Sequence, residues 1–494
     1  MNLSKSLYTK AIQCPKALWL KKYKKEVLTS PDATALARFE TGNVVGALAC
    51  DLFPGGREVI YNPDDFNGMV ETTKQWITDG LENIYEATFL YEGILVLVDV
   101  LKVTPNGLEI YEVKSSSSVK DIYLHDVSIQ LYVLRKLGYT VLNSNIIHID
   151  RDYVRGDELD LDELFVIVDV SDEVDTLQRG IPQKLEEFES YLVDKDNEPD
   201  INIGSHCNKP YECDAKEYCW NVQRNIPEYS LFNIFNLGSK KQIELYELGI
   251  VNIENIPDGY AMTAIQKQKV QNWKDQVTFI DEDNIKDFLN TLSYPIYHLD
   301  FETFQQAIPE WKGISPYQQI PFQYSLHIEY IDGTIKHKEF LGEDSVDPRY
   351  ELAKRLVEDI PIDVTVLAYN MSFEKGVNSK LAESFSEFKD HLLAINENTK
   401  DLMLPFQKKY YVTPQMQGSY SIKYVLPSLV PEMAEAYKSL NGIQNGGDAM
   451  NAFPKLSIMS SEEKEETRKA LLEYCKLDTL AMVKVLTKLK EVTQ

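Results

Sequence analysis

The sequence predicts a multidomain α/β protein in which two α/β domains are joined by a small helical segment. The chain has 494 residues, which at about 150 residues per domain corresponds to roughly three domains. Strand patterns alternate with helix patterns in the first and last parts of the chain, whereas the part between them has the pattern of short helices. We therefore expect domains at residues 1–222, 223–288 and 289–494.

The first domain is expected to contain a hairpin, a helix and a further strand, in that order. The apolar run 93–103 predicts a buried strand, and T-P-N-G at 104–107 predicts a turn. Residues 108–114 predict the returning strand of the hairpin. A helical period over 121–138 stops at a glycine, and 140–149 predicts the next strand.

The last domain is expected to start with a strand over 295–303. A hairpin follows, because Asp332 and Gly333 separate two strand patterns. Residues 363–369 predict another strand that leads into a helix, and 462–490 predict a long amphipathic helix. These elements predict a second α/β fold that is built separately from the first.

The middle segment contains a stretch, 231–257, that resembles a helix–hairpin–helix motif. Gly238 and Gly249 mark the turns, and Lys240 and Lys241 follow the first of them. In such motifs a helix N-terminus and backbone amides bind phosphate without reading base sequence. A plain helical connector explains the same residues equally well.

Composition and charge exclude some classes of protein. Charged residues make up 26% of the chain and hydrophobic residues 44%, which are ordinary values for a soluble protein. Apolar runs such as 94–98 are far shorter than the ~20 residues that span a bilayer, and the N-terminus lacks a signal-peptide pattern. We therefore expect a cytoplasmic protein with no membrane partner.

The net charge of −26 argues against a protein that coats polyanions generally. It still permits a nucleic-acid enzyme, because such enzymes bind through local basic patches. The first 25 residues hold seven lysines and no acidic residue. They form either such a patch or a solvated N-terminal helix.

The first predicted hairpin carries a group of residues suited to metal chemistry. Asp99 lies near the end of one strand, and Glu112 and Lys114 share a face of its partner. Converging carboxylates form a hard oxygen site suited to Mg²⁺, and a neighbouring lysine can orient water or stabilise phosphate charge. An E-V-K tripeptide alone is typical of surface strands, but the preceding aspartate and Gln130 on the downstream helix make the pattern more specific.

These residues resemble the PD-(D/E)XK nuclease superfamily, and its RecB-like branch in particular. That branch has a G…D strand, an E-x-K strand and a helix with Q-x-x-x-Y. The matching residues here are Gly93, Asp99, Glu112, Lys114 and Gln130. The resemblance implies a restriction-endonuclease-like fold, catalytic roles for the last four of these residues, and Mg²⁺ or Mn²⁺ on Asp99 and Glu112.

Two positions depart from the family pattern. The family's tyrosine falls on Leu134, and its helical histidine falls on Gly46 within G-N-V-V-G at 42–46. The metal site therefore lacks its expected histidine ligand. Glu86 is a further carboxylate that could take the place of that ligand.

Three of the six cysteines lie within 13 residues, and a fourth lies far away in sequence. Six cysteines in a chain of this length do not form a disulfide scaffold. Four thiolates can instead hold an iron–sulfur cluster or a zinc ion, and a neighbouring histidine, His206, keeps zinc as an alternative. The four expected ligands are Cys14, Cys207, Cys213 and Cys219. Cys50 and Cys475 are expected in the core.

The cysteine order resembles the iron–sulfur members of the RecB-like branch, including the CRISPR-associated adaptation exonucleases. They place one cysteine before the nuclease core and three after it, as in this sequence. The resemblance implies a 4Fe–4S cluster that clasps the two ends of the first domain.

The last domain carries a second group of carboxylates. Asp300 and Glu302 share a face of one strand, Tyr474 and Asp478 share a face of one helix, and Glu374 begins the helix after another strand. Converging carboxylates repel one another. Two divalent ions about 3.5–4 Å apart would neutralise them and clamp a phosphodiester, while the tyrosine could hydrogen-bond the attacking water.

This order resembles the DnaQ-like, RNase H-fold 3′–5′ exonucleases of the DEDD type, with D-x-E, N-x-x-F-D and Y-x-x-x-D motifs. The resemblance implies metal binding by Asp300, Glu302 and Asp478, and catalytic roles for Glu374 and Tyr474 as well. A glutamate at 374 departs from the family's aspartate. Asp401, which resembles an outer aspartate of the family, could substitute for it.

Nearly the whole chain resembles an uncharacterised bacterial family described as a predicted RecB-family nuclease fused to an RNase H-like domain. The stretches 320–327, 418–427 and 474–482 carry this resemblance. It implies nuclease activity, and we expect a metal-dependent deoxyribonuclease with two sites, acting as an exonuclease that favours single-stranded ends. A nucleic-acid-binding scaffold with one active site, and a ribonuclease, are the alternatives.

Overall fold

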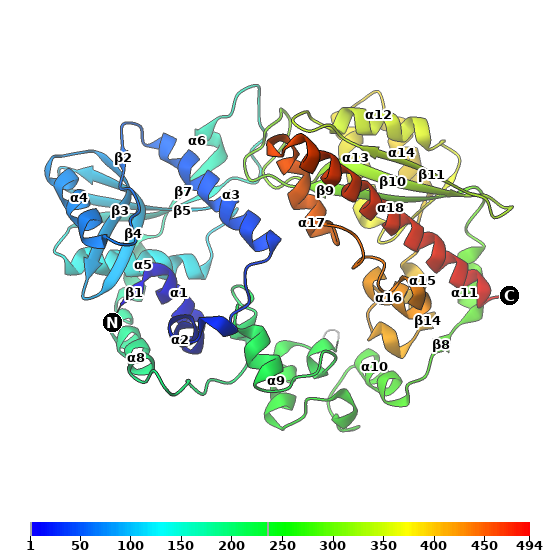
Figure 1. Ribbon diagram of the computed structural model, residues 1–494, viewed down its shortest axis with the longest axis horizontal. Helices are drawn as coiled ribbons and strands as arrows, with labels where there is room; N and C mark the ends of the chain where they lie inside the picture. Colours follow the sequence, from blue (N-terminus) through cyan, green and yellow to red (C-terminus); the bar gives the residue numbers. More distant parts are fainter. Residues whose placement is uncertain (1, 235–236) are drawn as a thin grey trace. The chain divides into compact units, whose positions relative to one another are not determined.

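The computed structural model describes residues 2–234 and 237–494 and contains two compact units (Figure 1). The first unit comprises Met1–Ile226 and Gln306–Tyr317, and the second comprises Pro227–Gln305 and Gln318–Gln494. Both units combine helices with a sheet, so the predicted α/β multidomain class is confirmed. Of the helical middle segment, residues 227–288 belong to the second unit and residues 223–226 to the first.

The first unit is built on a seven-stranded sheet in the order β2-β3-β4-β5-β6-β7, with β1 paired to β4. The β5–β6 pair is parallel and is connected by α5, whereas β3–β4, β4–β5 and β6–β7 are antiparallel. The strands are β1 Leu3–Ser4, β2 Arg57–Glu58, β3 Asn83–Tyr91, β4 Ile94–Thr104, β5 Gly107–Lys114, β6 Val141–Ile149 and β7 Phe165–Asp169. The predicted hairpin and the strand after the helix are confirmed.

Each face of this sheet has its own hydrophobic core. Helix α5 packs against β3 to β6 on one face, and α3 packs against β5 on the other. A short segment of the C-terminal half joins the first unit, because Arg155 N–H donates to the Ile314 carbonyl over 3.0 Å and the Tyr317 hydroxyl donates to the Ser115 carbonyl. The helices are α1 Lys5–Gln13, α2 Pro15–Tyr23, α3 Ala33–Ala49, α4 Phe66–Thr78, α5 Asp121–Lys136, α6 Leu161–Leu164, α7 Ser171–Gln178 and α8 Ile181–Val193.

The second unit is built on a five-stranded sheet in the order β11-β10-β9-β12-β13. Strand β10 is antiparallel to both of its neighbours, while β12 and β13 run parallel to β9. The strands are β9 Ile296–Phe304, β10 Ile320–Glu329, β11 Ile335–Leu341, β12 Thr365–Ala368 and β13 Thr399–Asp401. The predicted strands at 295–303 and 363–369 and the hairpin around Asp332 are therefore confirmed.

Helix α18 (Ser461–Glu491) runs along β9, β10 and β11 on one face of this sheet (Figure 1). The alternate residues of β9 face the other way, into a core formed with α12 Arg349–Asp359, α13 Ser372–Ser384 and α14 Lys389–Asn398. This alternation places Asp300 and Glu302 on one face of the strand and Leu299 and Phe301 on the other. The acidic side chains therefore lie under α18.

Shorter elements complete the second unit. Strands β8 Phe279–Ile280 and β14 Tyr411–Val412 form a small antiparallel pair. The helices are α9 Ser239–Glu247, α10 Ala264–Asp275, α11 Glu282–Leu289, α15 Leu404–Gln407, α16 Ile422–Leu429 and α17 Gly446–Ala452. The expected helix–hairpin–helix stretch contains α9 between Gly238 and Gly249, both at φ +77°. Its residues 235–236 lie outside the described residues.

Among the described residues, no helix is both long and apolar enough to cross a membrane.

Candidate active sites and cysteine cavity

Asp99 lies on β4 between the part of the strand that pairs with β1 and the part that pairs with β5. Strand β5 pairs with β4 over Val100–Thr104, whereas β1 pairs with the start of β4, at Ile94 and Leu95. Between these two partners, the Asp99 carboxylate accepts a hydrogen bond from the Val113 N–H over 2.8 Å. The aspartate is thereby fixed next to Glu112, as predicted.

The four residues predicted for the first site come together around Glu112, whose exposed fraction is 1%. One of its carboxylate oxygens accepts a hydrogen bond from Lys114 Nζ over 2.6 Å. The other accepts from Gln130 Nε2 over 2.7 Å. The Glu112 carboxylate is therefore held rigidly beside Asp99.

Two residues that the sequence analysis missed complete this site. Asp126 is buried on α5 and accepts from Lys114 Nζ over 2.7 Å. Lys5 Nζ lies 3.1 Å from Asp99 Oδ1 and 3.0 Å from both carboxylate oxygens of Glu112. Asp126 precedes Gln130 by four residues, so helical spacing could have indicated it. Lys5 lies 94 residues before Asp99 in sequence, and no local pattern relates them.

The carboxylates of this site raise the pKa of its lysines. Burial favours the neutral form of Lys5, but Asp99 and Glu112 outweigh it and raise the pKa of Lys5 well above its ordinary value. Burial and then Glu112 raise the pKa of Asp126. Glu112 and Asp126 likewise outweigh burial and raise the pKa of Lys114, so Lys5 and Lys114 are both ammonium groups at neutral pH.

Glu86 interrupts β3 next to Asp99. It has φ +53°, and the β3–β4 register passes from the Tyr85–Val100 pair to the Ala87–Val98 pair without it. Burial and the charge of Asp99 raise the pKa of Glu86 to about 7. Glu86 is thus available as a further carboxylate at this site, beside Asp99, Glu112 and Asp126.

The two departures from the expected nuclease pattern remain in the structure. Leu134 is fully buried in the core beneath the sheet. A Cβ added at Gly46 on α3 would meet no atom within 4 Å. Neither position supplies a polar group to the site.

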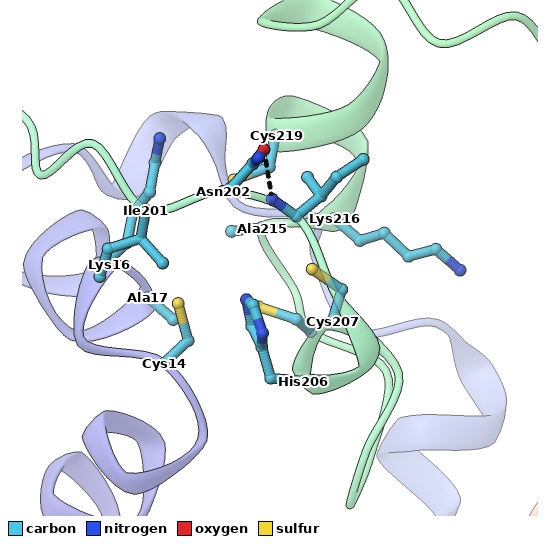
Figure 2. Close-up of a pocket in the computed structure, with 12 residues that line it drawn as sticks. Cys14, Lys16, Ala17, Ile201, Asn202, His206, Cys207, Ala215, Lys216 and Cys219 are labelled. Atoms are coloured by element: carbon cyan, nitrogen blue, oxygen red, sulfur yellow. Dashed lines mark hydrogen bonds between the residues drawn. The ribbon is translucent and has the colours of Figure 1, made fainter. Parts of the chain in front are cut away.

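The four expected cysteine ligands line one cavity of the first unit, together with His206. Cys14 lies between α1 and α2 and faces His206 and Cys207 across the cavity (Figure 2). None of the six cysteines, all of which lie in the described residues, forms a disulfide. Cys50 packs at the edge of the second core instead, and Cys475 is fully buried in the second unit.

The surroundings of the cavity lower the pKa of one cysteine, Cys207, and raise that of another, Cys213. Hydrogen bonds with Cys14 and Cys207 raise the pKa of His206 to about 10. Burial opposes ionisation of Cys207, but hydrogen bonds from His206 and Trp220 outweigh it and lower its pKa. Burial raises the pKa of Cys213 to about 11. A cationic group bound in this cavity would also stabilise the thiolate form of cysteines such as Cys213, whose pKa is raised.

The spread of the sulfur atoms bears on what this cavity can hold. Among the described residues, three ligand atoms lie within 4.8 Å of one another only at Asp300, Glu302 and Cys475. A tetrahedral zinc ion with Zn–S distances of about 2.3 Å needs its sulfurs closer together than that limit. The four cysteines are therefore spread more widely than the ligands of one zinc ion.

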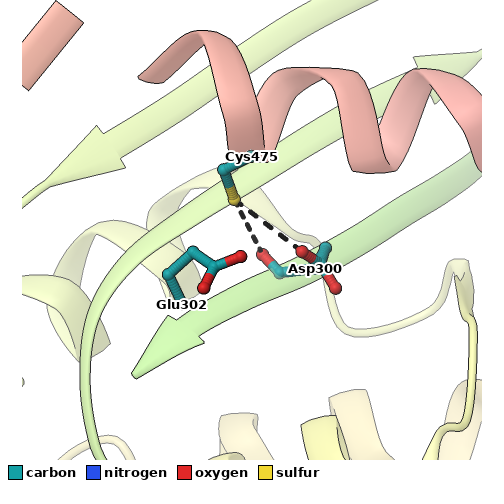
Figure 3. Close-up of side chains that lie close together, drawn as sticks. All are labelled: Asp300, Glu302 and Cys475. Atoms are coloured by element: carbon teal, nitrogen blue, oxygen red, sulfur yellow. Dashed lines mark hydrogen bonds between the residues drawn. The ribbon is translucent and has the colours of Figure 1, made fainter. Parts of the chain in front are cut away.

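The second unit gathers its predicted carboxylates beneath α18. Asp300 and Glu302 project from β9 toward this helix, and Cys475 projects back toward them (Figure 3). Cys475 Sγ lies 3.9 Å from Asp300 Oδ2. Burial and then the charge of Asp300 raise the pKa of Cys475 well above its ordinary value, so the group next to the carboxylates is a neutral thiol.

The other three predicted residues reach the same place. Asp478 accepts a hydrogen bond from the Tyr437 hydroxyl over 2.7 Å and a second from Tyr474. Glu374, with an exposed fraction of 2%, has one carboxylate oxygen, Oε2, without a hydrogen-bond partner among the described residues. Its charge, like that of Asp478, raises the pKa of Asp300. The structure thus brings together all five residues predicted for this site.

Burial raises every carboxyl pKa in this cluster, and the charges of neighbouring carboxylates raise those of Asp300 and Glu302 further. Burial and then Asp478 raise the pKa of Asp300 and of Glu302 well above their ordinary values. Burial raises the pKa of Glu374 to about 8 and that of Asp478 to about 6. No ion pair neutralises the four groups within the described residues of this unit. The charge of Lys423 lowers the pKa of Asp478, but among the described residues Lys423 forms no ion pair with these carboxylates.

Asp401 has a different position from the one expected of a substitute ligand. Its Oδ1 accepts from the N–H groups of Asn370 and Met403, over 3.0 and 2.9 Å. It thereby fixes the turn between β12 and α13, where Asn370 has φ +70°. The charge of Asp401 raises the pKa of Glu374, so Asp401 influences the cluster through its charge. Tyr437, which the sequence analysis missed, contacts the cluster directly through its hydrogen bond to Asp478 over 2.7 Å.

Comparison with known proteins connects this unit to a family without an assigned function. A family model described as "Domain of unknown function (DUF2779)" matches residues 297–421. The match includes Asp300, Glu302 and Glu374 and ends before Tyr474 and Asp478.

Two curated relatives are similarly uncharacterised. "Uncharacterized protein UU173" of Ureaplasma parvum is 25% identical over 289 residues, which are 54% of this chain and 41% of that protein. "Uncharacterized protein MG366" of Mycoplasma genitalium is 25% identical over 236 residues, 44% of this chain and 35% of that protein. The chain spans less than half the length of either relative.

Proposed function

We propose that the protein is a metal-dependent nuclease that hydrolyses phosphodiester bonds of DNA, with one hydrolytic site in each unit. The observation that carries this proposal is the cluster of buried carboxylates in the second unit. Four acidic groups buried side by side, two of which have their pKa raised by the charges of the others, are costly to fold unless a cation joins them. Their order and placement support an RNase H-like, DEDD-type exonuclease that favours single-stranded ends.

In the second unit, Asp300, Glu302 and Asp478 fit Mg²⁺ or Mn²⁺, because both ions prefer oxygen ligands. Such ions would lower the pKa of bound water and stabilise charge on the phosphate. The neutral Cys475 thiol is a poor ligand for hard ions, so the carboxylates are the expected ligands. Tyr474, through its hydrogen bond to Asp478, is the residue placed to orient the attacking water.

In the first unit, Asp99 and Glu112 are the proposed metal ligands of a PD-(D/E)XK, RecB-like site. Gln130 fixes the Glu112 carboxylate over 2.7 Å, and Lys114 presents a permanent positive charge to the same group. That charge can stabilise a phosphate as negative charge develops on it. The buried Leu134 occupies the position of the family's tyrosine, so the proposed site has no tyrosine there.

The four cysteines fit an iron–sulfur cluster better than zinc. Four soft donors line one cavity, and their sulfurs are spread more widely than the ligands of one zinc ion. A 4Fe–4S cluster binds each thiolate to a different iron and accommodates such a spread. Its proposed role is to hold α1 and α2 against the segment around residues 205–219.

A binding scaffold with one active site is the second candidate. The observation that favours it is the ammonium group of Lys5, which lies between the two proposed metal ligands of the first unit. In that case the first unit binds nucleic acid and the second unit cuts it.

The test is a cleavage assay with Mn²⁺ on end-labelled single-stranded DNA, duplex DNA and RNA. Native protein is compared with Glu112→Gln, Asp300→Asn and the double variant. We expect each single variant to retain part of the DNA cleavage and the double variant to lose it, by at least a hundredfold. Exposed carboxylates provide the matched controls: Glu186→Gln on α8 and Asp287→Asn on α11.

Loss of all cleavage in one single variant would identify the scaffold alternative. Preferential cleavage of RNA would identify a ribonuclease. Native protein that cuts none of the three substrates would contradict the proposal.

Tyr437→Phe is expected to make metal binding by the second unit more sensitive to acid. The hydroxyl of Tyr437 lowers the pKa of Asp478, and a hydrogen bond to a charged group contributes about 1.5–3 kcal/mol. Without it the pKa of Asp478 rises, so protons compete with metal over a wider range. Isothermal titration should show Mn²⁺ binding about tenfold weaker near pH 6.5 and little changed near pH 9. An equal loss at both pH values would contradict this explanation.

A further inference from the structure

The pairing of β1 with β4 places Lys5 at the first site. Strand β1 pairs with Ile94 and Leu95 of β4, and Leu3 N–H donates to the Gly93 carbonyl over 2.9 Å. Lys5 follows directly and starts α1. The division of the β4 edge that leaves Asp99 accessible thus also places a lysine beside it.

The far end of α1 is anchored, so the backbone of Lys5 is held from both sides. Lys10 Nζ contacts both carboxylate oxygens of Asp214, at 2.7 and 2.8 Å. Gln13 Nε2 donates to the backbone carbonyls of His206 and Tyr211, over 2.7 and 2.8 Å. Only the side chain of Lys5, with an exposed fraction of 22%, is free to turn toward solvent.

The ammonium of Lys5 fills the place that a metal ion would need. Its three N–H donors meet one oxygen of Asp99 and both oxygens of Glu112, at 3.0–3.1 Å. Mg²⁺ binds carboxylate oxygens at about 2.0–2.1 Å. An ion on these same oxygens would overlap with Nζ, and two cations at such a distance repel strongly. Metal and ammonium therefore exclude each other.

The charges of the two proposed sites differ accordingly. In the first site, Lys5 and Lys114 balance most of the charge of Asp99, Glu112 and Asp126. In the second site, no ion pair of the described residues balances the carboxylates. The first unit thus supplies ammonium groups in direct contact with its carboxylates, whereas the described residues of the second unit supply no such contact.

We propose that Lys5 is a tethered cation that occupies the Asp99–Glu112 site and that a divalent ion must displace it to bind. This inference rests on the proposed function of that site. Its consequence is that the first unit needs a higher metal concentration than its carboxylates alone would require, and that its metal-free state is held together by the lysine.

The test measures Mn²⁺ binding to the full chain by isothermal titration, without any substrate. An Asp300→Asn, Asp478→Asn background removes binding by the second unit. In this background we expect Lys5→Met to bind Mn²⁺ at least tenfold more tightly than the parent. Lys5→Arg, which keeps the charge, should not tighten binding. Lys21→Met is the matched control, because it removes a lysine from an exposed position on the neighbouring helix α2.

Unchanged or weaker Mn²⁺ binding in Lys5→Met would overturn the inference. Lys5→Gln, which keeps one donor, provides the same test if Lys5→Met does not fold. Glu112→Gln separates this failure from failure of the proposed function. If neither the parent nor the Lys5 variants bind Mn²⁺ in a way that depends on Glu112, the first unit has no such metal site, and both ideas fail together.

Discussion

Asp300→Asn is expected to stabilise the metal-free protein while it abolishes metal binding by the second unit. The four carboxylates beneath α18 are buried together, and burial and mutual repulsion raise the pKa of Asp300. Asparagine has nearly the same shape and no charge, so it removes repulsion without opening a cavity. Point substitutions with a defined physical cause change stability by about 0.5–3 kcal/mol, and we expect a gain near the upper end of that range.

The gain should depend on pH in a defined direction. Burial raises the pKa of Asp478 to about 6 and that of Glu374 to about 8, whereas carboxyl groups of unfolded chains titrate near pH 4. The folded protein therefore holds these protons more tightly than the unfolded chain. Native metal-free protein should lose stability as the pH rises from about 4 to about 8, and Asp300→Asn should reduce that loss.

Differential scanning calorimetry in the presence of a chelator measures this effect. At pH 8 the unfolding temperature of the second unit should rise by roughly 6–12 °C in Asp300→Asn. Mn²⁺ should raise the unfolding temperature of the native second unit but not that of the variant. Asp287→Asn, at an exposed position on α11, should change neither value. A destabilised Asp300→Asn protein would mean that the carboxylate has a structural partner.

The predicted site residues lie mostly on regular elements, and this explains why the sequence could indicate them. Glu112 and Lys114 are two apart on a strand, and Tyr474 and Asp478 are four apart on a helix, so periodicity alone places each pair on one face. The structure brings each pair to the expected partners.

The residues that were missed depend on tertiary structure. Lys5 reaches Asp99 because β1 pairs with β4, and two-residue strands carry no periodic signal. Tyr437 lies in an irregular segment between α16 and α17, where no repeat relates it to Asp478. The strand β3 was not predicted either, since Glu86, at φ +53°, breaks its regular pairing with β4.

Cys14→Ser is expected to have the largest effect on the first unit. Cys14 is the one cavity cysteine contributed by the N-terminal helices, and it faces Cys207 on the segment that follows the sheet. Binding of a cofactor by these cysteines stabilises the folded protein, because the unfolded chain does not hold the ligands together. Loss of this ligand should therefore release α1 and α2 from the segment around residues 205–219.

The expected result has three parts that can be measured on the same sample. Anaerobically purified native protein should show visible iron–sulfur absorption, and Cys14→Ser should lose most of it. The unfolding temperature of the first unit should fall by about 10 °C or more. Mn²⁺ binding by the second unit should remain unchanged, because Asp300 and Glu302 belong to a separate compact unit. Cys50→Ser, a cysteine of the first unit outside the cavity, should retain both absorption and stability.

Two outcomes would change the interpretation of the cavity in different ways. Colourless native protein that contains stoichiometric zinc would replace the cluster with a zinc ion, and the four sulfurs would then have to move closer together to bind it. Protein without bound metal whose stability does not respond to Cys14→Ser would mean that the cysteines are ordinary buried side chains. The lysine contacts of α1 with Asp99 and Asp214 and the core packing of Tyr8 and Ala11 would then tie that helix to the rest of the unit.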